Sequence, residues 1–331
     1  MRASRLWKMG VVLVVLAVAA PAVGVNIETV PVGNPGNADD THGDGYGGVA
    51  YEYNIAKYEV TAGQYTEFLN AVASTDTYGL YSTNMWSEDG CKIQQSGSAA
   101  SYTYGVTADW ADRPVNFVSW GDAARFSNWL ANGQPVGGQD LTTTEDGSYF
   151  LNGATTDAAL QAVTREADAT WVIPTEDEWY KAAYHKNDGV TGNYFDYATS
   201  SDSLPSNVLV EPTDPGNNAT FHPSGSDWTI GSPYYRTEVG AHENSDSPYG
   251  TFDQNGNVWE WNETMVGSYR GCRGGAYHNH WQFLPAAGYR SYSDTGSTYE
   301  SGVIGFRVVP EPASLALLAF GGVALLRRRR A

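Results

Sequence analysis

Two histidines stand close together near the end of the chain. The segment from Arg273 to Arg290 has the sequence RGGAYHNHWQFLPAAGYR and contains His278 and His280, with Asn279 between them. In an extended segment, side chains at positions i and i+2 point the same way, so two imidazole nitrogens could share a metal ion. No third ligand is evident nearby. The interpretation that we favour is a ligand pocket whose polar rim is formed by these three residues and Arg290.

Two carboxylates lie within eight residues of each other in a second segment, DQNGNVWEW. Asp253 and Glu260 flank an Asn255-Gly256 pair, which is typical of a turn. Ca²⁺ prefers six to eight hard oxygen ligands, including backbone carbonyls. The alternative is a turn that enters a buried, tryptophan-rich strand, with Glu260 paired to an arginine. The spacing differs from that of an EF-hand, so the segment alone does not decide between the two.

Other arrangements that could support catalysis are absent from the sequence or have a simpler explanation. Three consecutive acids, Glu176 to Glu178, stand where a helix is expected to begin, and the helix dipole and cap account for them. The sequence contains no GxSxG, HExxH or P-loop pattern. Standard serine-hydrolase, zinc-peptidase and nucleotide-binding signatures are therefore excluded.

Three amphipathic helices are predicted from their starting residues. Each begins with a Ser or Thr followed three positions later by Gln, Asp or Glu, which is the pattern of a capping box. The pairs are Thr61 with Gln64, Ser119 with Asp122, and Thr175 with Glu178. A short extended piece precedes each helix: 51–60, 113–118 and 170–173. Further strands are predicted within 257–263, 269–277 and 302–309.

Long stretches rich in Gly, Ser, Asn and Asp separate these elements. They cover residues 73–112, 132–165 and 186–250 and are longer than ordinary connections in a compact domain. We expect functional or inserted loops there. No linker or internal repeat interrupts the body, so residues 25–309 are predicted to form one domain.

The charge of the chain limits its partners. The 331 residues carry a formal net charge of −18, and seven of the 19 Lys and Arg residues stand in the two terminal segments. A body of this charge repels phosphate backbones, so we expect no nucleic-acid partner. It would instead attract divalent cations and basic surfaces.

Both ends have the composition of targeting segments. Residues 1–24 combine a basic start, an apolar run and small residues, as in a Sec signal peptide. Residues 310–331 contain a Pro-Glu-Pro triplet, an apolar run and four arginines, and they resemble a PEP-CTERM sorting signal of exported bacterial proteins. The resemblance implies recognition by a membrane-bound processing machinery and transient membrane association through a short C-terminal helix. A weak transmembrane anchor is the alternative.

The order of the remaining segments resembles a known family. KYEVTAGQYTEFLNAV, RPVNFVSWGDAARFSNWL, IPTEDEWYKAAY, SPYGTFDQNGNVWEWNE, RGGAYHN and GFRVV follow one another across most of the exported body. They are similar to segments of the formylglycine-generating enzymes, the sulfatase-modifying-factor domain family. The resemblance implies an irregular, loop-rich α+β fold, a variant of the C-type lectin fold.

The resemblance also implies two kinds of metal site. The catalytic members hold copper(I) between two cysteines, and counting from the glycine pair places those positions at Asn279 and Leu284 in this chain. Neither residue offers the soft thiolate that copper(I) favours, so copper is not expected. A structural calcium is implied at the side chains of Asp253 and Glu260 and the carbonyl oxygens of Gly256 and Val258. Asn207 is suggested for a second calcium.

The two cysteines, Cys91 and Cys272, stand outside the implied copper positions, and the sequence leaves open whether they pair. We therefore expect a noncatalytic protein of the cell surface, outer envelope or extracellular matrix, exported through the Sec pathway, that binds a ligand or partner. The alternative is an oxidoreductase or sulfatase-maturation factor with an altered site.

Overall fold

The computed structural model describes residues 24–41, 45–210, 213–223, 227–280 and 296–311. Its regular elements are few and short. The helices are α1 (Ala62–Val72), α2 (Trp120–Ala131), α3 (Asp157–Gln161) and α4 (Glu176–Tyr184), with 3₁₀ turns at Thr83–Trp86 and Ala108–Trp110. The strands are β1 (Thr29–Val32), β2 (Tyr53–Ala56), β3 (Ile93–Ser96), β4 (Thr103–Val106), β5 (Trp171–Val172), β6 (Trp259–Val266), β7 (Tyr269–Arg273), β8 (Ile304–Gly305) and β9 (Val309–Pro310). The expected irregular, loop-rich α+β fold is confirmed.

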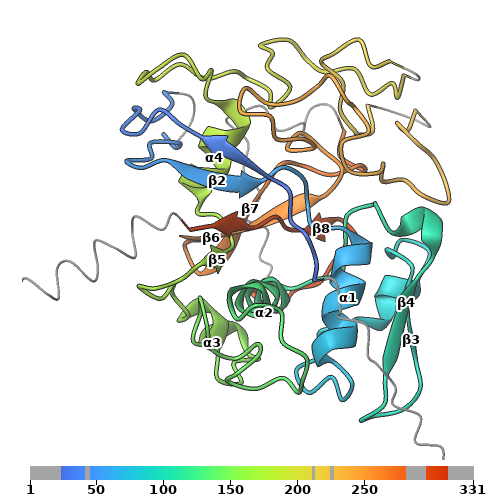
Figure 1. Ribbon diagram of the computed structural model, residues 1–331. Helices are drawn as coiled ribbons and strands as arrows, with labels where there is room; N and C mark the ends of the chain where they lie inside the picture. The colour runs from blue at the N-terminus through green and yellow to red at the C-terminus, as the bar shows by residue number, and fades with distance from the viewer. Residues whose placement is uncertain (1–23, 42–44, 211–212, 224–226, 281–295, 312–331) are drawn as a thin grey trace, which may run out of the picture.

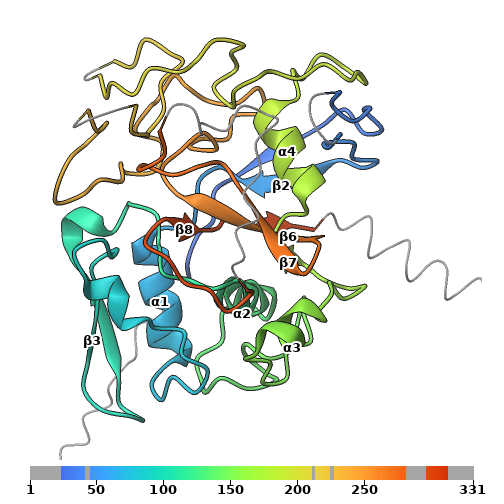
Figure 2. The ribbon, with the colours of Figure 1, turned by 180° about the vertical axis from the view of Figure 1, so that it is seen from behind.

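The strands form four small sheets rather than one large one. The largest has the order β7-β6-β8, with β6 antiparallel to β7 and parallel to β8. Figures 1 and 2 show α1 and α2 on one side of this sheet and α4 with β2 on the other. The loop 186–250, yellow in both views, gathers beyond α4 and contains no helix or strand in its described residues.

All three predicted capping boxes are present. Thr61, Ser119 and Thr175 each accept from the backbone N–H three positions on, and the side chain there accepts in return. These reciprocal bonds satisfy N–H groups that a helix start leaves without partners. The caps fix where each helix begins, so α4 starts shortly after β5, and it contacts β6 of the central sheet.

Replacing the cap of α4 is expected to weaken the domain measurably. Thr175→Ala removes the side-chain oxygen that accepts from the N–H of Glu178 at 3.1 Å. The free energy of unfolding should fall by about 1 kcal/mol in urea denaturation. Thr155→Ala, at an exposed position outside the helices, is the matched control and should change it by less than about 0.5 kcal/mol. Equal effects of the two substitutions would contradict the role of the cap.

Two stretches expected to be loops contain regular structure, and one expected extended piece does not. Residues 73–112 include the β3–β4 hairpin, and residues 132–165 include α3. Residues 113–118 form only an isolated bridge at Pro114, and Phe117 has a φ of 55°. A bulky side chain in that left-handed region interrupts an extended run.

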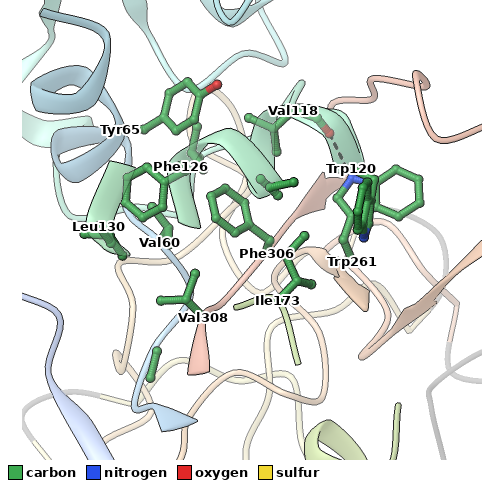
Figure 3. Close-up of a cluster of buried hydrophobic side chains, with 14 of the residues drawn as sticks. Val60, Tyr65, Val118, Trp120, Phe126, Leu130, Ile173, Trp261, Phe306 and Val308 are labelled. Atoms are coloured by element: carbon green, nitrogen blue, oxygen red, sulfur yellow. Dashed lines mark hydrogen bonds between the residues drawn. The ribbon is translucent and has the colours of Figure 1, made fainter. Parts of the chain in front are cut away.

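The main core lies between α1, α2 and the central sheet. Phe126 contacts Tyr65 and Phe306 through ring pairs at 6.1 and 5.4 Å. Trp261 is fully buried, and its indole N–H donates to the carbonyl of Val118 at 3.0 Å, as the dashed line in Figure 3 shows. Burial of such large rings dominates the stability of a domain with so little regular structure. The core thereby fixes β6, which carries Glu260.

Candidate functional site

The DQNGNVWEW segment forms the predicted turn and then enters β6. Asp253 and Asn257 have φ values of 62° and 57°, and Gly256 has a φ of 136°. A Cβ atom at Gly256 would lie 2.2 Å from the carbonyl oxygen of Thr220, so a side chain cannot fit there. The turn is thus packed against the 186–250 loop and places Asp253 and Glu260 inside the protein.

Glu260 is paired with a buried arginine. Arg307 donates from Nε to Oε2 at 2.5 Å and from Nη2 to Oε1 at 2.7 Å, and neither side chain is exposed. The indole of Trp179 donates to Glu260 Oε2 as well, at 2.8 Å. Arg307 also donates to three backbone carbonyls, those of Ala56, Lys57 and Phe252. This bidentate pair joins β2, β6 and the C-terminal segment.

Asp253 and Glu59 add two more carboxylates to the same interior region. Asp253 Oδ2 accepts from the N–H of Gly240 at 2.6 Å, and burial raises the pKa of Asp253 to about 6. Both carboxylate oxygens of Glu59 are buried, and neither has a hydrogen-bond partner among the described residues. Burial, and then the charges of Asp253 and Glu260, hold the pKa of Glu59 well above its usual range.

These carboxylates are oxygen donors of the type that a hard cation prefers, but both oxygens of Glu260 already accept from Arg307. Three carboxylates share the region with Arg307, so their full ionisation leaves an excess of negative charge, which buried sites avoid unless a cation is present. Asp253 also lines a cavity of about 10 Å³, the lower limit for one water, but neither Glu59 nor Glu260 lines it. Within the described ranges, however, no group of three or more His, Cys, Asp or Glu side chains is gathered closely enough to hold a metal ion.

Glu59 was missed by the sequence analysis. It stands in the segment predicted as a strand, where a period of two places it on the same face as the buried Tyr53 and Ile55. A carboxylate at an inward-facing position of a predicted strand was the pattern that could have identified Glu59 as a candidate site residue. Asn207, suggested for a second calcium, lies in the 186–250 loop and donates from its amide to the carbonyl of Asp227 at 2.7 Å.

The histidine segment forms a turn, so the extended geometry considered for a shared metal is wrong. The N–H of Asn279 donates to the carbonyl of Ala276 at 2.9 Å, and its Oδ1 accepts from the N–H of Ala276 at 2.7 Å. Asn279 therefore closes its own turn. His278 is exposed, and His280 is half-buried. Leu284 and Arg290 lie outside the described residues.

An aromatic cluster that the sequence did not reveal lies beside His278. The rings of His222 and Trp228 stack at 4.2 Å, and Tyr235 stacks on Tyr277 at 5.8 Å. Trp228 joins the two pairs, 5.1 Å from Tyr235 and 6.1 Å from Tyr277, and His278 lies 5.7 Å from Tyr277. We call these five residues the aromatic platform. Three of them come from the long 186–250 loop.

The platform is fixed to the protein from behind. The N–H of His222 donates to the carbonyl of Asn279 at 3.0 Å, which ties the loop to the histidine turn. The buried guanidinium of Arg236 lies 5.6 Å from the Tyr277 ring and donates to the carbonyl oxygens of Asp89, Gly90 and Gly302. The rings are therefore held in place rather than lying on a free loop.

The two cysteines are separate, buried thiols, so they form no disulfide. Cys272 lies in β7, and Cys91 lies before β3. Burial raises the pKa of both thiols, which disfavours the thiolate needed to bind copper(I). Neither residue stands at the positions now held by Asn279 and Leu284.

Comparisons with known proteins agree with this architecture. Residues 48–312 match the model of the sulfatase-modifying factor enzyme 1-like domain, and residues 308–330 match the PEP-CTERM protein-sorting motif. The fold is similar to that of CarF, with 19% identity over 87% of this chain and 99% of that one and a TM-score of 0.52. It is also similar to Treponema denticola variable protein 1, with 19% identity, coverage of 87% and 96%, and a TM-score of 0.51. No curated protein sequence matches the chain.

The sorting motif supports export to the cell envelope or surface. Among the residues that the structure describes, no helix is both long and apolar enough to cross a membrane. Residues 1–23 of the predicted signal peptide and the predicted C-terminal helix lie outside those residues.

Proposed function

Because the chain belongs to the sulfatase-modifying factor enzyme 1-like domain family, we propose that it is an exported, noncatalytic member that binds a ligand at the aromatic platform and is stabilised by calcium. The observation that carries the proposal is the replacement of both implied copper positions by Asn279 and Leu284. Asn279 uses its side chain to close a turn. The proposed location is the cell surface or extracellular matrix, reached by the Sec pathway.

The aromatic platform supports a ligand-binding function for this chain rather than an oxidase function. Half-buried Trp228, His222 and Tyr235 combine large apolar faces with polar edges, a combination suited to stacking on the apolar faces of sugar rings. The strongly acidic composition of the chain disfavours acidic polysaccharides as ligands. We therefore propose neutral glycans as the ligand class.

Affinity electrophoresis tests the platform directly. Migration of the exported domain in gels that contain dextran, xylan or β-glucan should be retarded by at least one of these neutral polymers. Trp228→Ala should abolish the retardation. Trp86→Ala is the matched control, because Trp86 is 45% exposed on a 3₁₀ turn outside the platform. Equal loss in both variants, or unchanged retardation in Trp228→Ala, would contradict the assignment.

Calcium is the second part of the proposal. The side chains of Asp253 and Glu260 and the carbonyl oxygens of Gly256 and Val258 are the proposed ligands, with the partnerless carboxylate of Glu59 as a further one. Glu260 would have to share with calcium the two oxygens that now accept from Arg307. Bound calcium would neutralise the excess of buried carboxylate charge and join β6 to the segment after β2. Its role would be to stabilise the domain that presents the platform.

An oxidoreductase or sulfatase-maturation factor with an altered site is the competing function. It would require a ligand set without the paired cysteines, since both thiols of the chain are buried elsewhere. Assays of metal content and oxygen consumption separate the two functions.

A further inference from the structure

The first two residues of the Pro-Glu-Pro triplet belong to the folded domain. Pro310 is the last residue of β9 and pairs with Trp171 of β5, while Val309 pairs with Val172. The N–H of Glu311 then donates to the carbonyl of Thr170 at 2.8 Å and so extends the same ladder. The domain therefore continues past residue 309, where the sequence analysis placed its end.

The carboxylate of Glu311 is held in a buried ionic cluster. Arg165 Nη1 pairs with Glu311 Oε1, and the Glu311 side chain is only 7% exposed. Arg165 pairs at the same time with Glu178 at 3.1 Å and with Glu263 at 3.0 Å. We call Arg165 and these three glutamates the Arg165 cluster.

Neighbouring elements hold the Arg165 cluster firmly. Glu178 is the capping glutamate of α4, and it accepts from the N–H of Thr175 at 2.7 Å and from the hydroxyl of Tyr51 at 2.7 Å. Glu263 of β6 accepts from the hydroxyl of Tyr149 at 2.7 Å. Arg165 also donates to the carbonyl of Ile173 at 3.2 Å, beside β5. Undocking Glu311 thus requires breaking both a strand pairing and a charge-assisted contact.

From this geometry we propose that the folded domain holds Pro310 and Glu311, the first two residues of the sorting triplet, in a docked state, so that the processing machinery can engage the triplet only when β9 and Glu311 are released. In the docked state the carboxylate and the backbone N–H of Glu311 are already bonded within the domain, so neither is available to an enzyme that recognises the triplet. The domain controls access to the triplet, while peptide-bond cleavage belongs to the machinery. The inference rests on the proposed export and sorting.

A spacer of four Gly and Ser residues inserted between Val309 and Pro310 tests whether docking limits access to the triplet. It leaves the triplet, Arg165 and the Val309–Val172 pair unchanged but lets the triplet leave the domain. The matched control carries the same spacer between Pro312 and Ala313, which lengthens the tail without undocking Glu311. Both chains and the native chain are expressed in a bacterium that has the sorting machinery, and tail removal is followed by pulse-chase.

Tail removal from the spacer variant should be roughly tenfold faster than from the native chain and the control, because engagement scales with the undocked fraction. In hydrogen exchange on the purified full chains, the Glu311 amide should be protected in the native chain and the control and exposed in the variant. If the tail is removed at equal rates from all three chains although the Glu311 amide of the variant is exposed, docking does not limit access to the triplet. That result would overturn this inference without contradicting the sorting assignment. No processing of any of the three chains would contradict the sorting assignment and the inference together.

Discussion

Arg307→Met is expected to destabilise the domain by about 3–5 kcal/mol, the range observed when one partner of a buried ion pair is removed. The substitution leaves Glu260 buried without its bidentate partner, next to Asp253 and Glu59. It also removes the donors to the carbonyls of Ala56 and Phe252, which link two other segments to β6. The loss should appear as a lower midpoint in urea denaturation with chelator present.

Two further variants separate the ion pair from general damage. Lys57→Met removes an exposed pair in which Glu28 is 57% exposed, and it should cost no more than about 1 kcal/mol. Adding Glu260→Gln to Arg307→Met removes the stranded charge and should recover part of the lost stability. A loss below about 1 kcal/mol in Arg307→Met, or no recovery in the double variant, would contradict this account of the interior.

Glu59→Gln should abolish stabilisation by calcium while leaving the calcium-free domain at least as stable as before. The carboxyl group of Glu59 has no hydrogen-bond partner among the described residues, and burial holds its pKa well above the usual range, so Gln removes a group whose charged form is disfavoured there at no cost in contacts. In the unsubstituted domain, calcium at 100 times its dissociation constant should add about 2.7 kcal/mol to the free energy of unfolding. Thermal unfolding with calcium and with chelator measures both effects.

The matched control is Glu67→Gln, because Glu67 is exposed on α1 and should leave the calcium response unchanged. A calcium response that survives in Glu59→Gln would remove this residue from the proposed site. No calcium response in the unsubstituted domain would contradict the calcium proposal as a whole.

The calcium effect should depend on pH. Burial raises the pKa of Asp253 to about 6 in the folded, calcium-free domain. A raised carboxyl pKa stabilises the calcium-free fold at low pH, and this contribution is lost as the pH rises through about 6. Calcium binds the ionised form, so the stabilisation by calcium should grow over the same interval. Thermal unfolding at pH 5 and pH 7.5 tests the sign, and a larger calcium effect at pH 5 would contradict it.

Local sequence patterns predicted the three helices whose first residues form hydrogen bonds within one helical turn. The pairs Thr61–Gln64, Ser119–Asp122 and Thr175–Glu178 mark helix starts because each bond closes within one turn. The β3–β4 hairpin was missed because its residues, such as Gln94 and Gln95, lack the apolar alternation that indicates a strand.

Contacts between residues that are far apart in the sequence could not be predicted from local patterns. Arg307 meets Glu260 across 47 positions, and Arg165 meets Glu311 across 146. Nothing in the spacing of these residues predicts their pairing, which depends on how the small sheets assemble. The aromatic platform was missed for the same reason, since a loop without regular structure gives no period that would place Trp228 beside Tyr277.

The most direct test of the central claim combines copper(I) titration of the purified exported domain with oxygen consumption on a cysteine-containing peptide derived from a sulfatase. We predict no stoichiometric, tight copper(I) site and no conversion of the cysteine above the rate without protein, because Asn279 and Leu284 supply no thiolate. One equivalent of tightly bound copper(I), with oxygen consumption coupled to loss of the peptide thiol, would contradict a noncatalytic binding protein.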